Sequence, residues 1–345
     1  DYLFNNFKDL SVGYKTKDYA HHLRYYSEKK WSICKLPIGV ENHLNNVLYQ
    51  YIGNIFFTTA TLYIDDSPEY FINEYGSKLT SEFSYCRFQN IFNYKQKSVC
   101  IVDTSISPYK YGSHQQMIEY RNDIDKAICK YALATNGRTL VLFMSNDELN
   151  RSYQQTEEFF RKYDILLLKQ NGNNIEDIQE FKRNEYSILY GTDRFWSGVD
   201  FPGPTLSQLI IVKAPNPSLR NPLIAHQKRW DNDFFENKYP IYGRLKLRQG
   251  FGRLIRSLRD KGGVIILDSR YGYNYGFSQH LNELPTKVIF DSDQESIMRQ
   301  VLRISGLNTE FDQRRIDPFL EVSKFNFACK ENKYGLMKNQ LNKAV

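Results

Sequence analysis

The sequence predicts a parallel α/β sheet with helices on both faces. Apolar runs of strand length alternate with segments of helical periodicity through most of the chain, and this alternation is typical of strand–helix–strand units. The runs are continuously apolar, as in residues 139–144, which indicates strands buried on both faces. Polar residues follow several runs, and in such sheets ligands bind beyond the carboxyl ends of the strands.

The N-terminal part of the chain has fewer clear elements. Residues 1–36 are polar and aromatic with weak periodicity. Residues 41–51 have the apolar spacing of a helix, and residues 54–59 form an apolar run that predicts a short buried strand. Residues 69–78 fit a further helix. The predicted sheet therefore lies mainly in the C-terminal three quarters of the chain.

The elements of the predicted sheet follow in order. The expected strands are residues 98–103, 139–144, 164–168, 187–191, 206–213 and 263–268. The expected helices are residues 114–134, 176–183, 223–233 and 292–304, with another beginning after Ser145. Apolar residues recur at helical spacing in 114–134, and Ser145-Asn-Asp is a capping signal for the helix that follows it.

Composition limits the class of protein without choosing its function. The 345 residues contain 46 Lys and Arg against 39 Asp and Glu, a net charge of +7, which suits a polyanionic partner but also fits many basic proteins. No apolar run approaches the roughly 18 residues of a membrane span, and no signal peptide pattern is visible. We therefore expect a cytoplasmic protein without a membrane partner.

The cysteines and histidines predict no metal site. The five cysteines stand far apart without a C-x-x-C pair, so they indicate neither a zinc site nor a disulfide framework. His21 and His22 are adjacent but lack a third ligand nearby in the sequence. We expect surface histidines and reduced structural thiols.

One basic stretch, residues 248–257, organises the functional interpretation. Treated as a helix that advances about 100° per residue, it places Gln249, Arg253 and Arg256 within roughly 60° of one another. Two guanidiniums and an amide suit a phosphate group whose charge is spread over several oxygens. The stretch therefore predicts a fork of phosphate-binding donors on one helical face.

Two glycines, Gly250 and Gly252, flank this donor face. Each costs about 1 kcal/mol relative to alanine in a helix interior, and a compact anion pressed against the backbone would compensate. A solvated basic face with a glycine-rich helix start explains the same spacing. The spacing alone does not choose between these two interpretations.

The same residues resemble a known family. Gln249-Gly-Phe-Gly-Arg253-Leu-Ile-Arg256-Ser resembles motif VI of superfamily 2 helicases in the form used by the DinG and XPD branch. Residues 190–203 are similar to motif V, Leu140-Val-Leu-Phe-Met-Ser145 to motif IV, and Phe57-Thr-Thr-Ala-Thr-Leu62 to motif III. These similarities follow the order of the family and cover roughly residues 30–310, which is more specific than any single motif.

This resemblance implies a RecA-like second motor domain with helices on both faces of a parallel sheet. It implies three regions: residues 1–65 as the tail of the first motor domain, residues 66–310 as the C-terminal motor domain and residues 311–345 as an extension. The implied cofactors are ATP and Mg²⁺, shared with the first motor domain. The iron–sulfur cluster of many family members is expected outside this segment.

The resemblance also assigns roles to single residues. The residues expected to act on the ATP phosphates as catalytic groups are Gln249, Arg253 and Arg256. Those expected near the bound nucleotide are Gly198, Asp200 and Gly252. Those expected at nucleic-acid phosphates are Ser145, Thr192 and Lys213. Those expected to couple nucleotide state to movement are Thr59, Ala60 and Thr61.

Half of an ATP site has no match in this sequence. A motor needs a glycine-rich loop with a Lys and an acidic pair for magnesium, and we find neither G-x-x-x-x-G-K-[ST] nor a strand ending in Asp-Glu-x-His. By resemblance we expect the C-terminal half of a DinG-type ATP-dependent DNA helicase. It would work with the N-terminal motor domain of the same protein, moving 5′ to 3′ on single-stranded DNA and opening forked duplexes. The segment alone is expected to be inactive.

Two other functions fit the sequence. One is a non-hydrolysing module that binds single-stranded nucleic acid or completes the ATP site of a partner in trans. The other is an unrelated parallel α/β enzyme that uses Asp200 or Asp268 as a catalytic carboxylate. The enzyme hypothesis predicts a pocket closed within one domain, whereas the helicase hypothesis predicts an open basic face.

Overall fold

The structure divides the chain into two compact units. It is a computed structural model that describes residues 19–27, 30–76, 84–88, 90–108, 113–170, 174–196, 198–201, 203, 205–307 and 316–327. One unit combines Asp1–Gln89 with Asn216–Leu245, and the other combines Asn90–Pro215 with Lys246–Val345. Residues 216–245 thus group with the N-terminal unit, although the sequence-based boundaries put them inside the 66–310 domain. The reason is packing, since a helix of this segment contacts the first strand of the chain.

The second unit is built on one seven-stranded sheet. Its strands are β3 (Ser98–Asp103), β4 (Thr139–Leu142), β5 (Leu166–Lys169), β6 (Ser187–Gly191), β7 (Gln208–Ile211), β8 (Gly262–Ile266) and β9 (Lys287–Asp291). They lie in the order β5-β6-β4-β7-β8-β3-β9, and each neighbouring pair is parallel. The predicted fold class, a parallel sheet of the α/β type, is confirmed.

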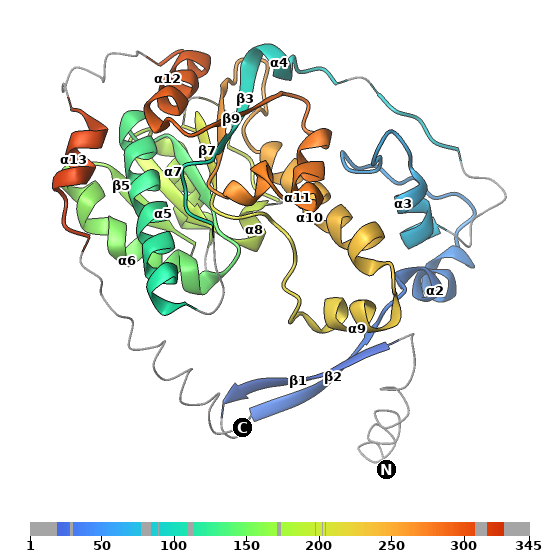
Figure 1. Ribbon diagram of the computed structural model, residues 1–345. Helices are drawn as coiled ribbons and strands as arrows, with labels where there is room; N and C mark the ends of the chain where they lie inside the picture. Colours follow the sequence, from blue (N-terminus) through green and yellow to red (C-terminus); the bar gives the residue numbers. More distant parts are fainter. Residues whose placement is uncertain are drawn as a thin grey trace. The chain divides into compact units, whose positions relative to one another are not determined.

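Helices cover both faces of this sheet (Figure 1). The longer ones are α5 (His114–Ala134), α6 (Asn146–Lys162), α7 (Asn174–Arg183), α10 (Tyr239–Phe251) and α12 (Gln294–Ser305). The short ones are α4 (Tyr94–Lys97), α8 (Asp193–Trp196), α11 (Tyr275–Ser278), α13 (Pro318–Lys324) and the 3₁₀ turns η5 (Ser269–Gly272) and η6 (Gln279–Glu283). Helices α5, α6, α12 and α13 pack on one face, and α7, α8 and α10 pack on the other.

Alternate side chains of each strand point into two hydrophobic cores, one on each face of the sheet. In β3, Ile101 points into the core under α5 and α6, whereas Cys100 and Val102 point into the core under α8 and α10. All three side chains are fully buried. This two-sided burial explains why the strands are continuously apolar in sequence. Because every neighbouring pair is parallel, the carboxyl ends of all seven strands lie at one edge of the sheet.

Several sequence-based elements match the structure residue for residue. The strands at 98–103 and 187–191 and the helix at 114–134 have the predicted bounds. The predicted cap is confirmed, because the Ser145 hydroxyl accepts the Glu148 backbone N–H at 3.2 Å. Strand β9 was not predicted, since this short edge strand is only partly buried along its length. Of the expected extension at 311–345, residues 316–327 are described and include α13 on α5, and the rest lies outside the described residues.

The first unit contains an antiparallel hairpin that the weak periodicity of residues 1–36 does not predict. Its strands are β1 (Tyr19–Ser27) and β2 (Lys30–Pro37). Its helical segments are α2 (Val40–Leu44), η1 (Asn45–Tyr49), α3 (Glu69–Phe71), η2 (Ile72–Gly76), α9 (Pro222–Trp230) and η4 (Phe234–Lys238). Helix α9 packs against β1.

The expected buried strand at residues 54–59 is wrong. These residues have no regular secondary structure, and Phe56 is 96% exposed. A strand needs a neighbour for its backbone N–H and C=O groups. Within the described residues of this unit, strand pairing joins β1 to β2 and Ile64 to Ser67. An apolar run therefore does not become a strand here.

The expected helix over residues 248–257 is wrong in its second half. Helix α10 ends at Phe251, and residues 252–254 form turns. Leu258, which a continued helix would place opposite the donor face, is 65% exposed. The helical wheel that placed Arg253 and Arg256 on one face therefore does not apply.

The glycine at position 250 is explained by packing rather than by a bound anion. A Cβ atom at Gly250 would lie 2.8 Å from Cε3 and Cζ3 of the Trp196 ring. Such a distance is well inside van der Waals contact, so only glycine lets α10 approach the ring this closely. The predicted anion is not needed to account for this residue.

We predict that Gly250→Ala lowers the free energy of unfolding by about 1–3 kcal/mol, because overpacking against Trp196 outweighs the gain in helix propensity. Urea denaturation measures this change. Gly252→Ala is the matched control, because its Cβ would lie 3.4 Å from the nearest atoms, the carbonyl oxygens of Arg248 and Gln249. Equal stability of the Gly250 variant and the wild type would contradict the packing explanation.

Candidate nucleotide and nucleic-acid site

Arg253 is the most enclosed of the three residues expected at the ATP phosphates. It is 8% exposed. Its Nε donates to the Trp196 carbonyl at 3.2 Å, and its Nη1 donates to the Val199 carbonyl. Burial, with help from the neighbouring Arg256, lowers the pKa of Arg253 to about 10, so the guanidinium stays charged at neutral pH. Arg253 thus holds the segment after α8 in place.

Arg256 is open to solvent and paired with another predicted residue. Its Nε lies 3.2 Å from Oδ1 of Asp200, and the two side chains are 33% and 60% exposed. An exposed ion pair of this kind contributes little to stability, so either partner is able to exchange for a ligand. The structure therefore brings together one predicted arginine and one predicted nucleotide-binding carboxylate.

A buried carboxylate that the sequence interpretation missed fixes the backbone beside Arg256. Asp260 accepts the backbone N–H of Arg256 at 2.8 Å and that of Ser257 at 2.7 Å. It also accepts the Ser257 hydroxyl at 2.7 Å and the Gly203 N–H at 3.2 Å. Asp260 thereby joins the loop after α10 to the loop before β7. The sequence signal that could have identified Asp260 is its Ser-x-x-Asp spacing from Ser257, the last residue of the segment that resembles motif VI.

The other predicted nucleotide residues lie around these loops. Gln249 is partly exposed near the end of α10. Gly198 has a φ of +88° and open space where a Cβ would be, so a side chain is disfavoured by the backbone rather than by crowding. Gly252 lies in the turn that ends α10.

The predicted nucleic-acid residues follow adjacent strands of the sheet. Ser145 follows β4 and is exposed, whereas Thr192 follows β6 and is 4% exposed. The Thr192 hydroxyl lies 3.0 Å from Oδ1 of Asn146 and 3.0 Å from Oε1 of Gln170. Thr192 is thus engaged inside the protein, whereas Ser145 and Asn146 are exposed at this edge.

The edge continues past β7 and β8. Lys213 follows β7 and is partly buried, and its pKa is lowered by this burial and by Arg270. Asp268 follows β8 and is 4% exposed. Its carboxylate accepts the Ala214 N–H at 2.8 Å and binds Arg270 with both oxygens. Asp268 is thus occupied as a structural anchor, which argues against the catalytic role it has in the enzyme hypothesis.

Known proteins resemble much of this chain. The helicase C-terminal domain family matches residues 128–286. The 3'-5' exonuclease DinG of Bacillus subtilis (strain 168) is 31% identical over 257 residues, which cover 71% of this chain and 27% of that protein. The ATP-dependent DNA helicase YoaA of Escherichia coli (strain K12) is 28% identical over 257 residues, covering 71% of this chain and 37% of that protein.

The chain carries a DinG/XPD-like superfamily 2 helicase C-terminal domain. A solved XPD helicase structure matches with a TM-score of 0.53 at 18% identity, covering 83% of this chain and 49% of that one. A second XPD structure, of the apo protein, matches with a TM-score of 0.50 at 17% identity, covering 84% and 57%. These likenesses support the RecA-like fold. The chain spans only about a third of the two curated relatives.

In the other unit, residues 58–60 of the segment that resembles motif III are exposed. The Thr59 and Thr61 hydroxyls lie 3.0 Å apart, and the Thr61 backbone N–H donates to the Thr59 hydroxyl at 3.2 Å. Ala60 is exposed between them. This is a local hydrogen-bonded turn rather than the end of a buried strand.

A strained turn follows the motif III segment and is held by α10. Asp65 and Asp66 have φ values of +49° and +61°, a conformation that costs energy for residues other than glycine. The Asp65 carboxylate makes a two-point ion pair with Arg244 in the first half of α10. Arg244 is 8% exposed. The ion pair fixes the turn to the helix that leads into motif VI.

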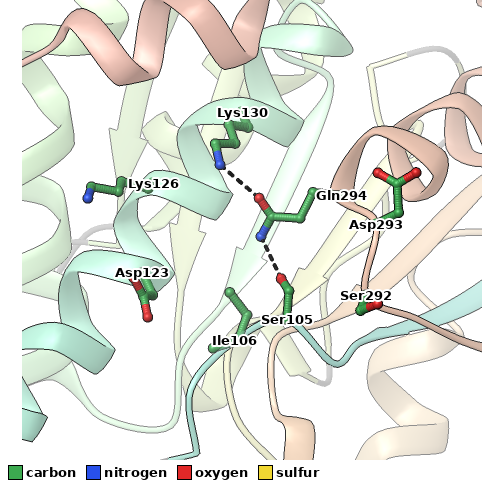
Figure 2. A pocket seen from close by; sticks show the side chains of 8 residues that line it. All are labelled: Ser105, Ile106, Asp123, Lys126, Lys130, Ser292, Asp293 and Gln294. Carbon is green, nitrogen blue, oxygen red and sulfur yellow. Dashed lines mark hydrogen bonds between the residues drawn. The ribbon is translucent and has the colours of Figure 1, made fainter.

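A polar pocket in the helicase domain lies beyond β3 and β9 (Figure 2). Its volume is about 370 Å³. Lys130 donates to Gln294 at 2.8 Å, and Gln294 donates to the Ser105 hydroxyl at 3.0 Å and to the buried Asp103 at 3.0 Å. The lining residues are Ser105, Ile106, Asp123, Lys126, Lys130, Ser292, Asp293 and Gln294. Two lysines balance two aspartates, and neither Asp200 nor Asp268 lines this pocket.

The described residues contain no metal cluster: no three His, Cys, Asp or Glu side chains there gather in an arrangement that could hold an ion. Cys34, Cys86, Cys100 and Cys129 are free thiols, and Cys329 lies outside the described residues. In the parts of the chain that the structure describes, no helix combines the length and apolar character required to cross a membrane.

We predict that Asp260→Ala lowers the free energy of unfolding by about 2–4 kcal/mol, because two backbone N–H groups beside Arg256 lose a charged acceptor in a buried position. Urea denaturation again provides the measurement. The matched control is Asp200→Ala, which removes an exposed carboxylate and is expected to change stability by less than about 1 kcal/mol. If the two substitutions cost the same, Asp260 is not the anchor of this loop.

We also predict that the ion pair of Asp65 makes stability depend on pH. The hydrogen bond from Arg244 lowers the pKa of Asp65, so the stabilisation is fully present above the unfolded-state pKa of about 3.9 and is lost as the pH falls through the lower folded-state value. Asp65→Asn should therefore be less stable than the wild type at pH 7. The difference should shrink as unfolding is measured at progressively lower pH, and a constant difference would contradict this assignment.

Proposed function

We propose that this chain contributes the second motor domain of an ATP-dependent DNA helicase of the DinG type. In this proposal, ATP and Mg²⁺ bind between this domain and an N-terminal motor domain that carries a phosphate-binding loop. The E. coli relative is named an ATP-dependent DNA helicase, and the family matched at residues 128–286 is a helicase domain. We therefore carry over helicase activity rather than the exonuclease activity named for the B. subtilis relative.

The observation that carries this proposal is the solvent-accessible guanidinium of Arg256. Its backbone is fixed by the buried Asp260, whereas its side chain meets only the exposed Asp200 among the ion pairs described. A fixed backbone and an exposed guanidinium suit a residue that binds phosphate when two domains close. We propose that the γ-phosphate displaces Asp200 from Arg256, and that Asp200 then faces the nucleotide or its Mg²⁺.

The remaining motif residues support this arrangement in different ways. We propose that Arg253 mainly holds the Trp196–Val199 backbone, because its guanidinium already serves two carbonyl groups. Gln249 is partly exposed near the end of α10 and would meet the nucleotide directly. Gly198 and Gly252 would keep the loops near the nucleotide free of side chains.

The nucleic-acid track would run along the carboxyl edge of the sheet. We propose that Ser145 and Lys213 contact phosphates of single-stranded DNA, and that Thr192 supports them from inside. Thr59, Ala60 and Thr61 would couple closure to movement in the 5′ to 3′ direction that the family implies. Forked duplex DNA is then the expected substrate, and the cytoplasm the expected location.

The test uses Arg256→Ala in the protein that includes its N-terminal motor domain. ATP binding should stay within a few-fold of wild type, because most binding contacts come from the phosphate loop. DNA-stimulated hydrolysis should fall by roughly 10³-fold or more, since an arginine at the transferring phosphate contributes about 4–7 kcal/mol to the transition state. Single-turnover hydrolysis and nucleotide titration measure the two effects separately.

Arg299→Ala is the matched control, because Arg299 also makes an exposed ion pair, at 3.1 Å with Glu295 on α12. It should leave hydrolysis unchanged. Unaltered turnover in Arg256→Ala would refute the assignment of this arginine. Magnesium-dependent hydrolysis by the present chain alone would refute the proposal that it holds only half of the ATP site.

A further inference from the structure

Three loops meet at the carboxyl edge of the sheet and are tied together by one side chain. Strands β5, β6 and β4 are adjacent, and the loops that follow them contain Gln170, Thr192 and Asn146. The parallel ladders extend beyond the strands, because Gln170 N–H donates to the Tyr190 carbonyl at 2.8 Å and Phe143 N–H to the Gly191 carbonyl at 2.9 Å. The three loops therefore leave the sheet side by side.

Gln170 bonds to the central residue of this group, Thr192. Its Oε1 accepts the Thr192 backbone N–H at 2.8 Å and lies 3.0 Å from the Thr192 hydroxyl. A carbonyl oxygen has two lone pairs and is able to accept both donors. The hydroxyl has one hydrogen, so while the Thr192 backbone N–H donates to Gln170, the hydroxyl is left to donate to Oδ1 of Asn146, which lies 3.0 Å away. The group then closes as a chain from Gln170 through Thr192 to Asn146.

Thr192 differs in burial from Ser145 and Asn146. Thr192 is 4% exposed, so its hydroxyl is not presented to solvent. Ser145 and Asn146 are exposed at the start of the 17-residue helix α6. Ion pairs also hold the start of α6, because Glu148 pairs with Arg121 at 2.5 Å and with Arg151 at 3.2 Å.

We propose that Gln170 is a positioning residue for nucleic-acid binding, which acts through Thr192 to hold Ser145 and Asn146 where they meet a phosphate of single-stranded DNA. The motif resemblance assigns no role to Gln170. The inference rests on the proposed function, because it requires that this edge of the sheet touches nucleic acid. Without Gln170, the Thr192 N–H loses its acceptor and the loop after β6 no longer fixes the start of α6.

The experiment measures binding of the full chain to a fluorescent oligothymidylate of about 20 nucleotides by anisotropy over a series of salt concentrations. Gln170→Leu removes the acceptor at similar side-chain size. We expect its affinity to fall about tenfold, and the slope of log affinity against log salt to fall by about one phosphate contact. Gln154→Leu, the same substitution at an exposed position of α6, should match the wild type in both.

A double-mutant cycle with Thr192→Val tests whether Gln170 acts through Thr192. If it does, the double variant should lose little more affinity than either single variant, because the two side chains form one chain of hydrogen bonds. Urea denaturation of each variant accompanies the cycle, since a purely structural role lowers stability without changing the salt slope. If Gln170→Leu does not fold, Gln170→Asn takes its place, because its shorter side chain withdraws the acceptor while keeping the amide.

The outcomes separate the two proposals. Wild-type affinity and slope in the Gln170 variants, or strictly additive losses in the cycle, would overturn the role of Gln170 and leave the proposed function standing. If the wild-type chain binds no oligothymidylate at any salt concentration, the nucleic-acid part of the proposed function fails, and the positioning role fails with it.

Discussion

The packing of Trp196 against α10 holds the helicase domain together as a functional unit. The indole N–H donates to the Phe143 carbonyl beyond β4 at 3.3 Å. The ring lies against Gly250, and the backbone carbonyl accepts a hydrogen bond from Arg253. One residue therefore joins the end of β4, which leads to Ser145, with the helix that leads to Arg256. This contact therefore links the proposed nucleic-acid edge to the segment that carries the proposed nucleotide arginine.

Buried or partly buried polar side chains that hold loop backbones recur around the sheet. Asp260 fixes the loop that carries Arg256, Asp268 fixes Ala214 after β7, and Gln170 fixes Thr192 after β6. Asp103 has the same role at the polar pocket beyond β3 and β9, where it accepts hydrogen bonds from Ser105, Tyr131 and Gln294. Backbone N–H groups in loops have no partner in a helix or sheet, and a side-chain acceptor supplies one. An acceptor that is used in this way is no longer available for chemistry. These polar groups are anchors, and the reactive groups are the exposed ones beside them.

The motif resemblance treats Arg253 and Arg256 alike, and the structure separates them. Arg253 is enclosed and bonded to two carbonyl groups, whereas the side chain of Arg256 is a third exposed. A guanidinium is able to stabilise developing charge on phosphate only where phosphate reaches it. Thr192 and Ser145 divide in the same way at the other site. In both pairs, one residue supports the loop and its neighbour faces outward.

Local patterns in the sequence determined the fold class, most of the strands of the sheet, the cap at Ser145 and the order of the motifs. Apolar periodicity, capping residues and motif spacing are properties of neighbouring residues, and they survive in the sequence. The tertiary structure alone decided that α10 stops at Phe251, that Gly250 serves the Trp196 ring, that residues 54–59 form no strand and that Thr192 is buried. Each of these depends on contacts between segments far apart in the chain, because burial and hydrogen-bond partners exist only after the sheet has assembled.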